Sequence, residues 1–78
     1  MPRLELYIVD VNTGDPVTAE VILNGRRFIA EGGVLIIDLP MGLYRVIVRA
    51  EGYDVLRTYV RCPGRYVLRL IPTAEWLR

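Results

Sequence analysis

The sequence predicts an all-β protein, an antiparallel β-sandwich of about seven short strands. Apolar and polar residues alternate with a period of two almost everywhere, turn residues separate the alternating runs, and helical periodicity is nearly absent. The 78 residues make one domain, near the lower size limit for a self-sufficient core. The high share of hydrophobic residues, 53%, compensates for this small size. We expect that domain to span residues 1–72, with residues 73–78 as a C-terminal tail.

Four strands are expected in the first half of the chain, over residues 3–11, 17–24, 26–30 and 34–39. Asn24-Gly25 supplies two positions that tolerate positive φ, which predicts a tight hairpin between the second and third strands. The fourth strand is apolar on both faces apart from Asp38. The inward residues of the first two strands are expected to be Leu4, Leu6, Ile8, Val17, Ala19, Val21 and Leu23.

Three strands are expected in the second half, over residues 44–50, 55–62 and 65–71. Leu39-Pro40-Met41-Gly42 suits a type I turn before them, and Pro63-Gly64 suits a type II turn because glycine accepts the positive φ that this turn requires. Pro72 cannot donate to a ladder and is expected to end the sheet. The inward residues are expected to be Tyr44, Val46, Val48, Ala50, Leu56, Thr58, Val60, Cys62, Tyr66, Leu68 and Leu70.

Several residue types that are common in catalytic sites are missing from the chain. It has no His, Lys, Ser or Gln, so all ten basic residues are Arg, and the usual general base and hydroxyl nucleophile are absent. The lone Cys62 makes no internal disulfide and no zinc cluster, and it is interpreted as a small core residue. We therefore expect a protein that is not an enzyme and has no catalytic residues, cofactor, metal or small-molecule substrate.

The acidic loop from Asp10 to Asp15 is the nearest approach to a metal motif. It resembles a calcium loop only faintly, because the distal bidentate Glu and the full set of alternating oxygen ligands are missing. A turn stabilised by bonds from an Asx side chain is the preferred interpretation.

The composition also bears on the environment. No apolar run reaches the roughly 18 residues that a membrane helix needs, and the start lacks a signal-peptide segment, so we expect a cytoplasmic protein with no membrane partner. The missing Gln, the single Cys and the short loops indicate a thermophilic source, while the use of Arg in place of Lys fits a GC-rich genome equally well.

Turn and core motifs along the chain resemble those of a known group of domains. The motifs are Val9-Asp10, Thr13-Gly14-Asp15-Pro16-Val17 with Ala19, Val21 and Leu23, then Leu39-Pro40-Met41-Gly42-Leu43-Tyr44 and Gly52-Tyr53. They resemble the carboxypeptidase regulatory-like domains, and PEGA-type domains and collagen-adhesin B-type repeats share similar spacing. The resemblance spans about residues 6–70 and implies a prealbumin-like, or transthyretin-like, sandwich.

The resemblance also implies a class of function. Such domains serve as non-catalytic accessory, adhesive or spacer modules beside other domains. Many adhesin-type members have an isopeptide bond from a Lys, and this chain has no Lys, so that cross-link is impossible here.

Arginines dominate the outward positions of the last three expected strands. Residues 41–78 have a net charge of +4 and residues 1–40 a net charge of −3. This predicts a basic sheet face for nucleic-acid phosphates or another polyanion, and the alternative is a solvated face whose arginines pair with Glu5, Glu20 or Asp38. The candidate residues are Arg45, Arg49, Arg57, Tyr59, Arg61, Arg65 and Arg69.

Many outward positions are apolar, which indicates a covered surface. The candidate interface residues are Tyr7, Val9, Ile22, Ile36, Ile47, Val67, Ile71 and Trp76. The alternatives are a strand whose faces are assigned wrongly or a patch covered by the tail. Thr73 is a candidate cap of one helical turn in that tail, and Trp76 is a candidate for docking on the sheet or on a partner, unless the terminus is frayed.

The sequence thus predicts a non-enzymatic structural or protein-interaction module, self-associating or docked on a larger protein. The alternative function is a small nucleic-acid-binding protein that uses the arginine-rich sheet face.

Overall fold

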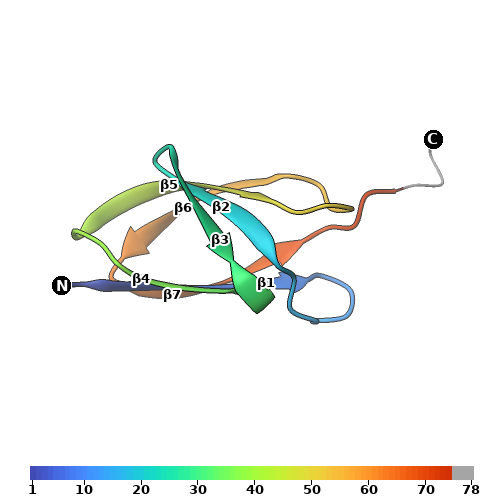
Figure 1. Ribbon diagram of the computed structural model, residues 1–78, viewed down its shortest axis with the longest axis horizontal. Coiled ribbons are helices and arrows are strands. Elements are labelled where there is room, and N and C mark those ends of the chain that lie inside the picture. The colour runs from blue at the N-terminus through green and yellow to red at the C-terminus, as the bar shows by residue number, and fades with distance from the viewer. Residues whose placement is uncertain (75–78) are drawn as a thin grey trace.

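Two packed β-sheets form the protein in the computed structural model, which describes residues 1–74 (Figure 1). The elements are β1 (Arg3–Asp10), β2 (Ala19–Leu23), β3 (Arg26–Ala30), the short 3-10 helix η1 (Glu31–Gly33), β4 (Val34–Asp38), β5 (Gly42–Arg49), β6 (Leu56–Cys62) and β7 (Gly64–Leu70). The predicted all-β class and its seven strands are confirmed, with bounds close to those expected from the alternation.

The strands divide into a three-stranded sheet, in the order β4-β1-β7, and a four-stranded sheet, in the order β3-β2-β5-β6. The chain passes from one sheet to the other four times, between β1 and β2, β3 and β4, β4 and β5, and β6 and β7. The edge strands are β4 and β7 in the first sheet and β3 and β6 in the second. The prediction of a wholly antiparallel sandwich is wrong at one pairing, because β7 runs parallel to β1. Alternation specifies which face a residue occupies and leaves the strand direction open.

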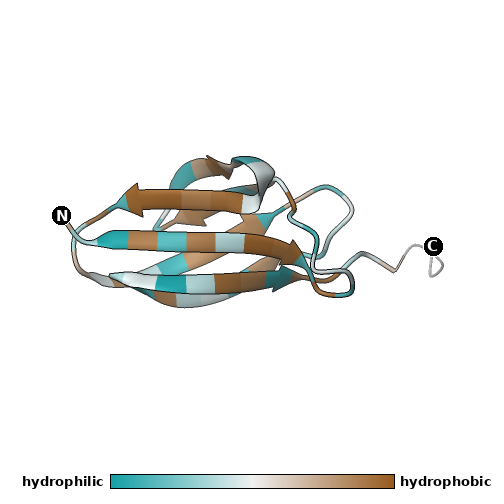
Figure 2. Ribbon diagram, turned by 90° about the horizontal axis from the view of Figure 1, so that it is seen from below, coloured by the Kyte–Doolittle hydropathy of each residue, from teal (hydrophilic) through white to brown (hydrophobic). Residues whose placement is uncertain are grey.

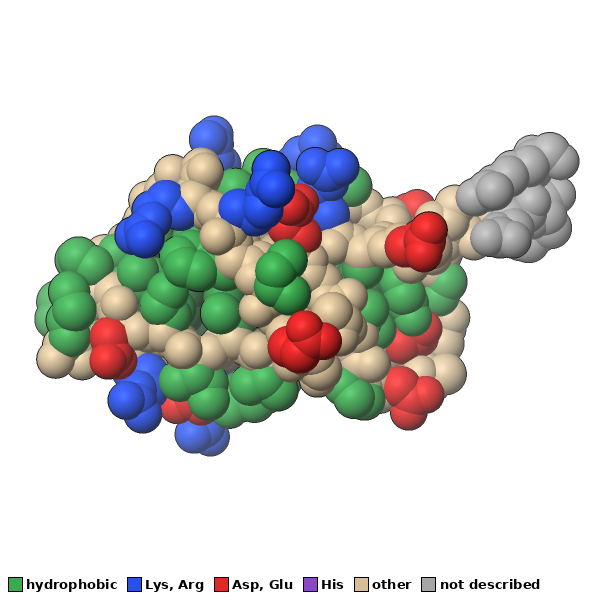
Figure 3. Space-filling view, viewed as in Figure 1, with side chains coloured by type: hydrophobic (Ala, Val, Ile, Leu, Met, Phe, Trp, Pro, Cys, Tyr) green, Lys and Arg blue, Asp and Glu red, His purple; other side chains and the backbone are tan. Residues whose placement is uncertain are grey.

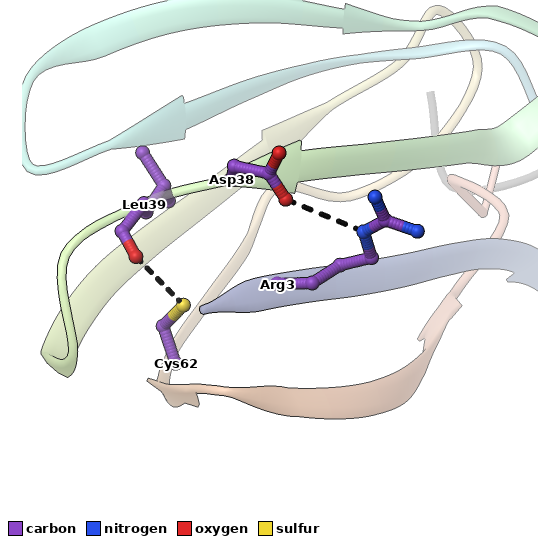
Figure 4. Close-up of polar contacts among 4 residues, drawn as sticks. All are labelled: Arg3, Asp38, Leu39 and Cys62. Carbon is purple, nitrogen blue, oxygen red and sulfur yellow. Dashed lines mark hydrogen bonds and ion pairs between the residues drawn. The ribbon is translucent and has the colours of Figure 1, made fainter. Parts of the chain in front are cut away.

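The core lies between the sheets and consists of the inward residues of the alternating strands. Leu6 and Ile8 from β1 and Val21 and Val46 from β2 and β5 are completely buried. Burial of such a side chain contributes about 1.5–3 kcal/mol, which makes the alternation the main determinant of this fold. The predicted core position of Cys62 is confirmed, since it is 2% exposed and its Sγ lies 3.4 Å from the carbonyl oxygen of Leu39 (Figure 4).

The Asn24-Gly25 turn forms the hairpin that the sequence predicts. Asn24 and Gly25 have φ of 47° and 87°, as a tight hairpin with two left-handed residues requires. The Asn24 side-chain oxygen accepts a bond from the Arg45 backbone N–H (2.8 Å), and the Asn24 N–H donates to the Arg45 carbonyl (3.0 Å). The turn therefore fixes the β2–β3 hairpin onto β5.

The connection between β6 and β7 differs from the expected type II turn. Gly64 begins β7 without a positive φ, and the Cys62–Pro63 bond is cis. Glycine is needed here because of space, since a Cβ at this position would lie 2.6 Å from the Arg61 carbonyl oxygen. The Arg61 N–H donates to the Tyr66 hydroxyl (2.9 Å), which closes the connection between the sheets.

Candidate interaction surfaces

The outer face of the four-stranded sheet is strongly basic. Its strands point five arginines and one acid, Glu20, outward, and Figure 3 shows basic side chains gathered over this sheet. These arginines are Arg27, Arg45, Arg49, Arg57 and Arg61. Since the whole chain has a net charge of only +1, the charge is concentrated on one side of the molecule.

Only part of this charge is paired within the protein. Glu20 forms ion pairs with Arg27, whose Nε lies 2.9 Å from one carboxylate oxygen, and with Arg49, whose Nη1 lies 3.7 Å from the other. Within residues 1–74, no carboxylate lies within 4.0 Å of the guanidinium groups of the other three arginines. A shallow pocket on this side of the molecule has charged residues of both signs in its lining. It is lined by Glu20, Arg49, Ala50, Glu51 and Val55.

Tyr59 lies among these three arginines, which have no ion pair within residues 1–74. The register places Tyr59 of β6 opposite Arg45 of β5, and Arg57 and Arg61 lie two residues away on the same face of β6. Tyr59 is 62% exposed. The structure therefore places an exposed aromatic ring and three positive charges together on the edge strand β6 and its neighbour β5.

The outer face of the three-stranded sheet is apolar across its middle. Tyr7 of β1 is flanked by Val34 of β4 and Val67 of β7, so one row without charge crosses all three strands. Ile36 and Val9 border this row on the same face. We call these five residues the apolar strip, and Figure 2 shows that β4, which lies beside β1, is hydrophobic along most of its length.

Charged side chains on this second face are mostly paired. Arg3 Nε lies 3.3 Å from an Asp38 oxygen, as Figure 4 shows, and Arg65 Nε lies 3.4 Å from a Glu5 oxygen. The Tyr7 hydroxyl donates to Glu5 at 2.7 Å. This bond, with the nearby Arg65, lowers the pKa of Glu5, and the same bond raises the pKa of Tyr7.

The structure divides the arginine set that the sequence suggested. Arg65 and Arg69 project from β7 on the three-stranded sheet, so they do not join the other candidates around Tyr59. The expectation of one continuous basic face is wrong, because β7 pairs with β1 rather than with β6. Of the anticipated ion pairs, those of Glu5 and Glu20 involve candidate arginines, while Asp38 pairs with Arg3.

The apolar candidates are divided in the same way. Tyr7, Val9, Ile36 and Val67 share the outer face of the three-stranded sheet. Ile22 and Ile47 lie opposite each other on the four-stranded sheet, where both are half-buried. The remaining candidates are Ile71, which follows β7 and is 58% exposed, and Trp76, which lies outside the described residues.

Two surface residues were missed from the sequence. Val34 completes the apolar row, and the continuous apolar run of its strand was the available signal. Arg27 joins the basic face beside Ile22. The two-residue Asn24-Gly25 turn fixes this pairing, so the position of Arg27 follows from the turn.

Asp10 organises the loop at the other end of β1. Its carboxylate accepts bonds from the backbone N–H groups of Asn12 (2.7 Å) and Thr13 (3.1 Å) and from the Tyr53 hydroxyl (2.7 Å). The Tyr53 bond and the Asn12 bond lower the pKa of Asp10, and the carboxylate raises the pKa of Tyr53. These bonds are those of the predicted Asx turn. Nowhere in residues 1–74 do three His, Cys, Asp or Glu side chains converge as metal ligands.

The chain beyond β7 runs beside the loop that follows β5. Pro72 forms a bridge with Tyr53, and the Thr73 N–H donates to the Gly52 carbonyl at 2.9 Å. The helical turn expected after Thr73 lies outside the described residues.

Comparison with protein-family models and with curated proteins gives no match to this chain. Within the described part of the chain, no helix has the length and apolarity to cross a membrane. The interpretation of the two faces therefore rests on their geometry and charge.

Proposed function

We propose that this protein is a non-catalytic interaction module that associates with a second copy of itself through the apolar strip. The observation that supports this most directly is the uncharged row of Val34, Tyr7 and Val67 across the full width of the three-stranded sheet. Val34, Ile36 and Val67 are 41–51% exposed, so burying them against another surface removes apolar area from water.

The charges around the strip favour a second copy as the partner. The outward strand residues of this face comprise three arginines and two acids, so two copies meet with nearly balanced charge. A two-fold interface places the same patch on both sides, which requires a self-complementary surface. The four-stranded sheet, with five outward arginines and one acid, would repel its own copy.

The edge strand β4 adds to this surface. It has five residues, it supplies Val34 and Ile36 to the strip, and its only charged residue is Asp38. Edge strands without protecting Lys, Arg or Pro are templates for pairing with another chain.

The resemblance to carboxypeptidase regulatory-like and PEGA-type domains agrees with such a role, and we include a prealbumin-like arrangement of the sheets in the proposal. Domains of that kind act through their surfaces rather than through catalytic residues. The cytoplasmic location and the thermophilic source remain predictions from the composition.

Sedimentation equilibrium across a range of concentrations tests the proposal. The wild type should change from the 8.9 kDa monomer towards twice that mass as its concentration rises. Ile36→Arg, in the strip, should remain monomeric at concentrations about ten-fold higher, because it places a charge in the interface.

Ile29→Arg is the matched control. Ile29 also lies in an edge strand and is similarly exposed, 56% against 51% for Ile36, but it belongs to the four-stranded sheet. It should associate as the wild type does. A wild type that stays monomeric at millimolar concentration, or equal loss in both variants, would contradict the proposal.

A further inference from the structure

The second surface of interest is the Tyr59 patch, which consists of Tyr59, Arg45, Arg57 and Arg61. Along β6, the two arginines lie about 6.6–6.8 Å on either side of Tyr59, and Arg45 is directly opposite it at a Cβ separation of about 4.5–5.5 Å. β6 is an edge strand, so the patch borders the open side of the sheet. Tyr59 is thus flanked by arginines on its own strand and on the neighbouring strand.

The charges of this patch call for an anion from outside. Like charges held on neighbouring positions of a sheet repel each other. Arg27 and Arg49, on the same face, share Glu20 as a counter-charge, whereas no carboxylate of residues 1–74 is within ion-pair distance of the three patch arginines. An external anion would offset their mutual repulsion.

We propose that the Tyr59 patch binds single-stranded nucleic acid, with the three guanidinium groups on successive phosphates and one base stacked on Tyr59. Arginine forks fit phosphate oxygens, and exposed aromatic rings on a sheet stack unpaired bases. Charge alone would suit any polyanion, but a tyrosine 62% exposed at the centre of the patch favours a ligand that has flat rings between its charges. A duplex keeps its bases stacked inside, which favours a single strand.

Fluorescence anisotropy with a labelled single-stranded oligonucleotide of about twelve nucleotides measures the binding. Three neutralised phosphates predict that log K falls against log salt with a slope of about −2. Raising the salt from 50 to 200 mM should therefore weaken binding roughly 10- to 20-fold.

Two triple variants separate the patch from net charge. Arg45→Ala with Arg57→Ala and Arg61→Ala should abolish measurable binding. The control, Arg3→Ala with Arg65→Ala and Arg69→Ala, removes the same number of charges from the other sheet and should retain wild-type affinity. Circular dichroism confirms that both variants are folded.

Tyr59→Ala tests the stacking step. It should weaken oligonucleotide binding at least about five-fold, as loss of one stacked base does, and leave the binding of inorganic polyphosphate unchanged. Tyr59→Phe keeps the ring and should restore oligonucleotide affinity.

Several results would overturn the proposal. They are no binding by the wild type at 50 mM salt, equal losses in the two triple variants, an unchanged affinity in Tyr59→Ala, and equal or tighter binding of duplex DNA or a poly-Glu peptide. The first result would leave the self-association proposal intact, because the two proposals use opposite sheets.

Discussion

The outer face of the three-stranded sheet bears three arginines and two acids around an apolar row, whereas the outer face of the four-stranded sheet bears five arginines and one acid around a half-buried isoleucine pair. Both faces arise from the same alternation of inward and outward residues. They differ because β1 contributes Glu5 to the middle of its sheet, while β5 and β6 contribute arginines without acids. Charge pairing therefore depends on which strands become neighbours.

This comparison also separates two kinds of binding. A face with balanced charge and an apolar row can bury itself against its own copy. A face with excess charge and an open ring is suited to an oppositely charged ligand with flat rings, which is the partner we propose for it. Three substitutions test this comparison: one in the core that both faces share, one where the two sheets meet, and one on the basic face.

The largest effect is expected from the core that both faces share. Leu6 lies on β1 at the centre of the three-stranded sheet and is completely buried. Leu6→Ala should lower the free energy of unfolding by about 2–5 kcal/mol, through lost burial and the cavity that remains. Urea unfolding followed by circular dichroism measures the loss.

The proposed self-association and oligonucleotide binding should both be lost at urea concentrations that unfold this variant. Each surface variant, in contrast, should affect only the face that it alters. Ile36→Ala, on the outer side of the same sheet, is the control and should cost less than about 1 kcal/mol. Association or oligonucleotide binding that survives in unfolded Leu6→Ala would show that the activity does not come from a sheet face.

A smaller effect is expected where the two sheets meet at the Asp10 loop. Tyr53, in the segment between β5 and β6, donates to Asp10 at the end of β1. Tyr53→Phe should lower the thermal midpoint by about 4–8 °C near neutral pH, which corresponds to the loss of about 1 kcal/mol for one hydrogen bond at a partly exposed site. Differential scanning calorimetry at several pH values measures this difference.

The difference should depend on pH in one direction. Because folding lowers the pKa of Asp10 below its ordinary 3.8, the stabilisation is complete above that value and is lost as the pH falls through the folded-state pKa. Wild type and Tyr53→Phe should therefore converge in acid. Tyr44→Phe removes a bond to the neutral Pro40 carbonyl (2.7 Å) and should show a difference that does not vary with pH; a similar constancy in Tyr53→Phe would refute the account of Asp10.

The smallest effect is expected from the single acid of the basic face. Glu20→Gln removes the counter-charge of Arg27 and Arg49 and should tighten oligonucleotide binding by about two- to five-fold, with a steeper salt dependence. Glu5→Gln removes the same charge from the other face, at a side chain that is equally exposed (23%), and should leave this affinity unchanged. Equal gains in both variants would mean that net charge, rather than the face, controls binding; fluorescence anisotropy distinguishes the two outcomes.

Much of the fold was predictable because burial and turn chemistry act locally. The inward positions of Leu4, Leu6 and Ile8, the Asn24-Gly25 hairpin and the buried Cys62 all follow from a period of two and from residues that tolerate positive φ. The Pro63-Gly64 connection was not predictable in the same way, since its geometry depends on the close approach of the Arg61 carbonyl and the Tyr66 ring to Gly64.

The candidate surfaces were only half predictable. Alternation placed Arg57, Tyr59 and Arg61 together, because they lie on one strand. It did not separate them from Arg65 and Arg69, which follow at once in the sequence but belong to the other sheet. Nor did it join Val34 to Tyr7 and Val67, because strand pairing at long sequence separation has no local signal.

By itself the sequence determined the strands, their inward faces and the absence of His, Lys, Ser and Gln, since each of these is a property of composition or of neighbouring positions. The tertiary structure alone decided that β7 pairs with β1, parallel and on the sheet opposite β6. That pairing joins Leu4 to Gly64, sixty residues away, and depends on how the whole core closes. It is also the contact that makes one outer face apolar and balanced and leaves the other basic.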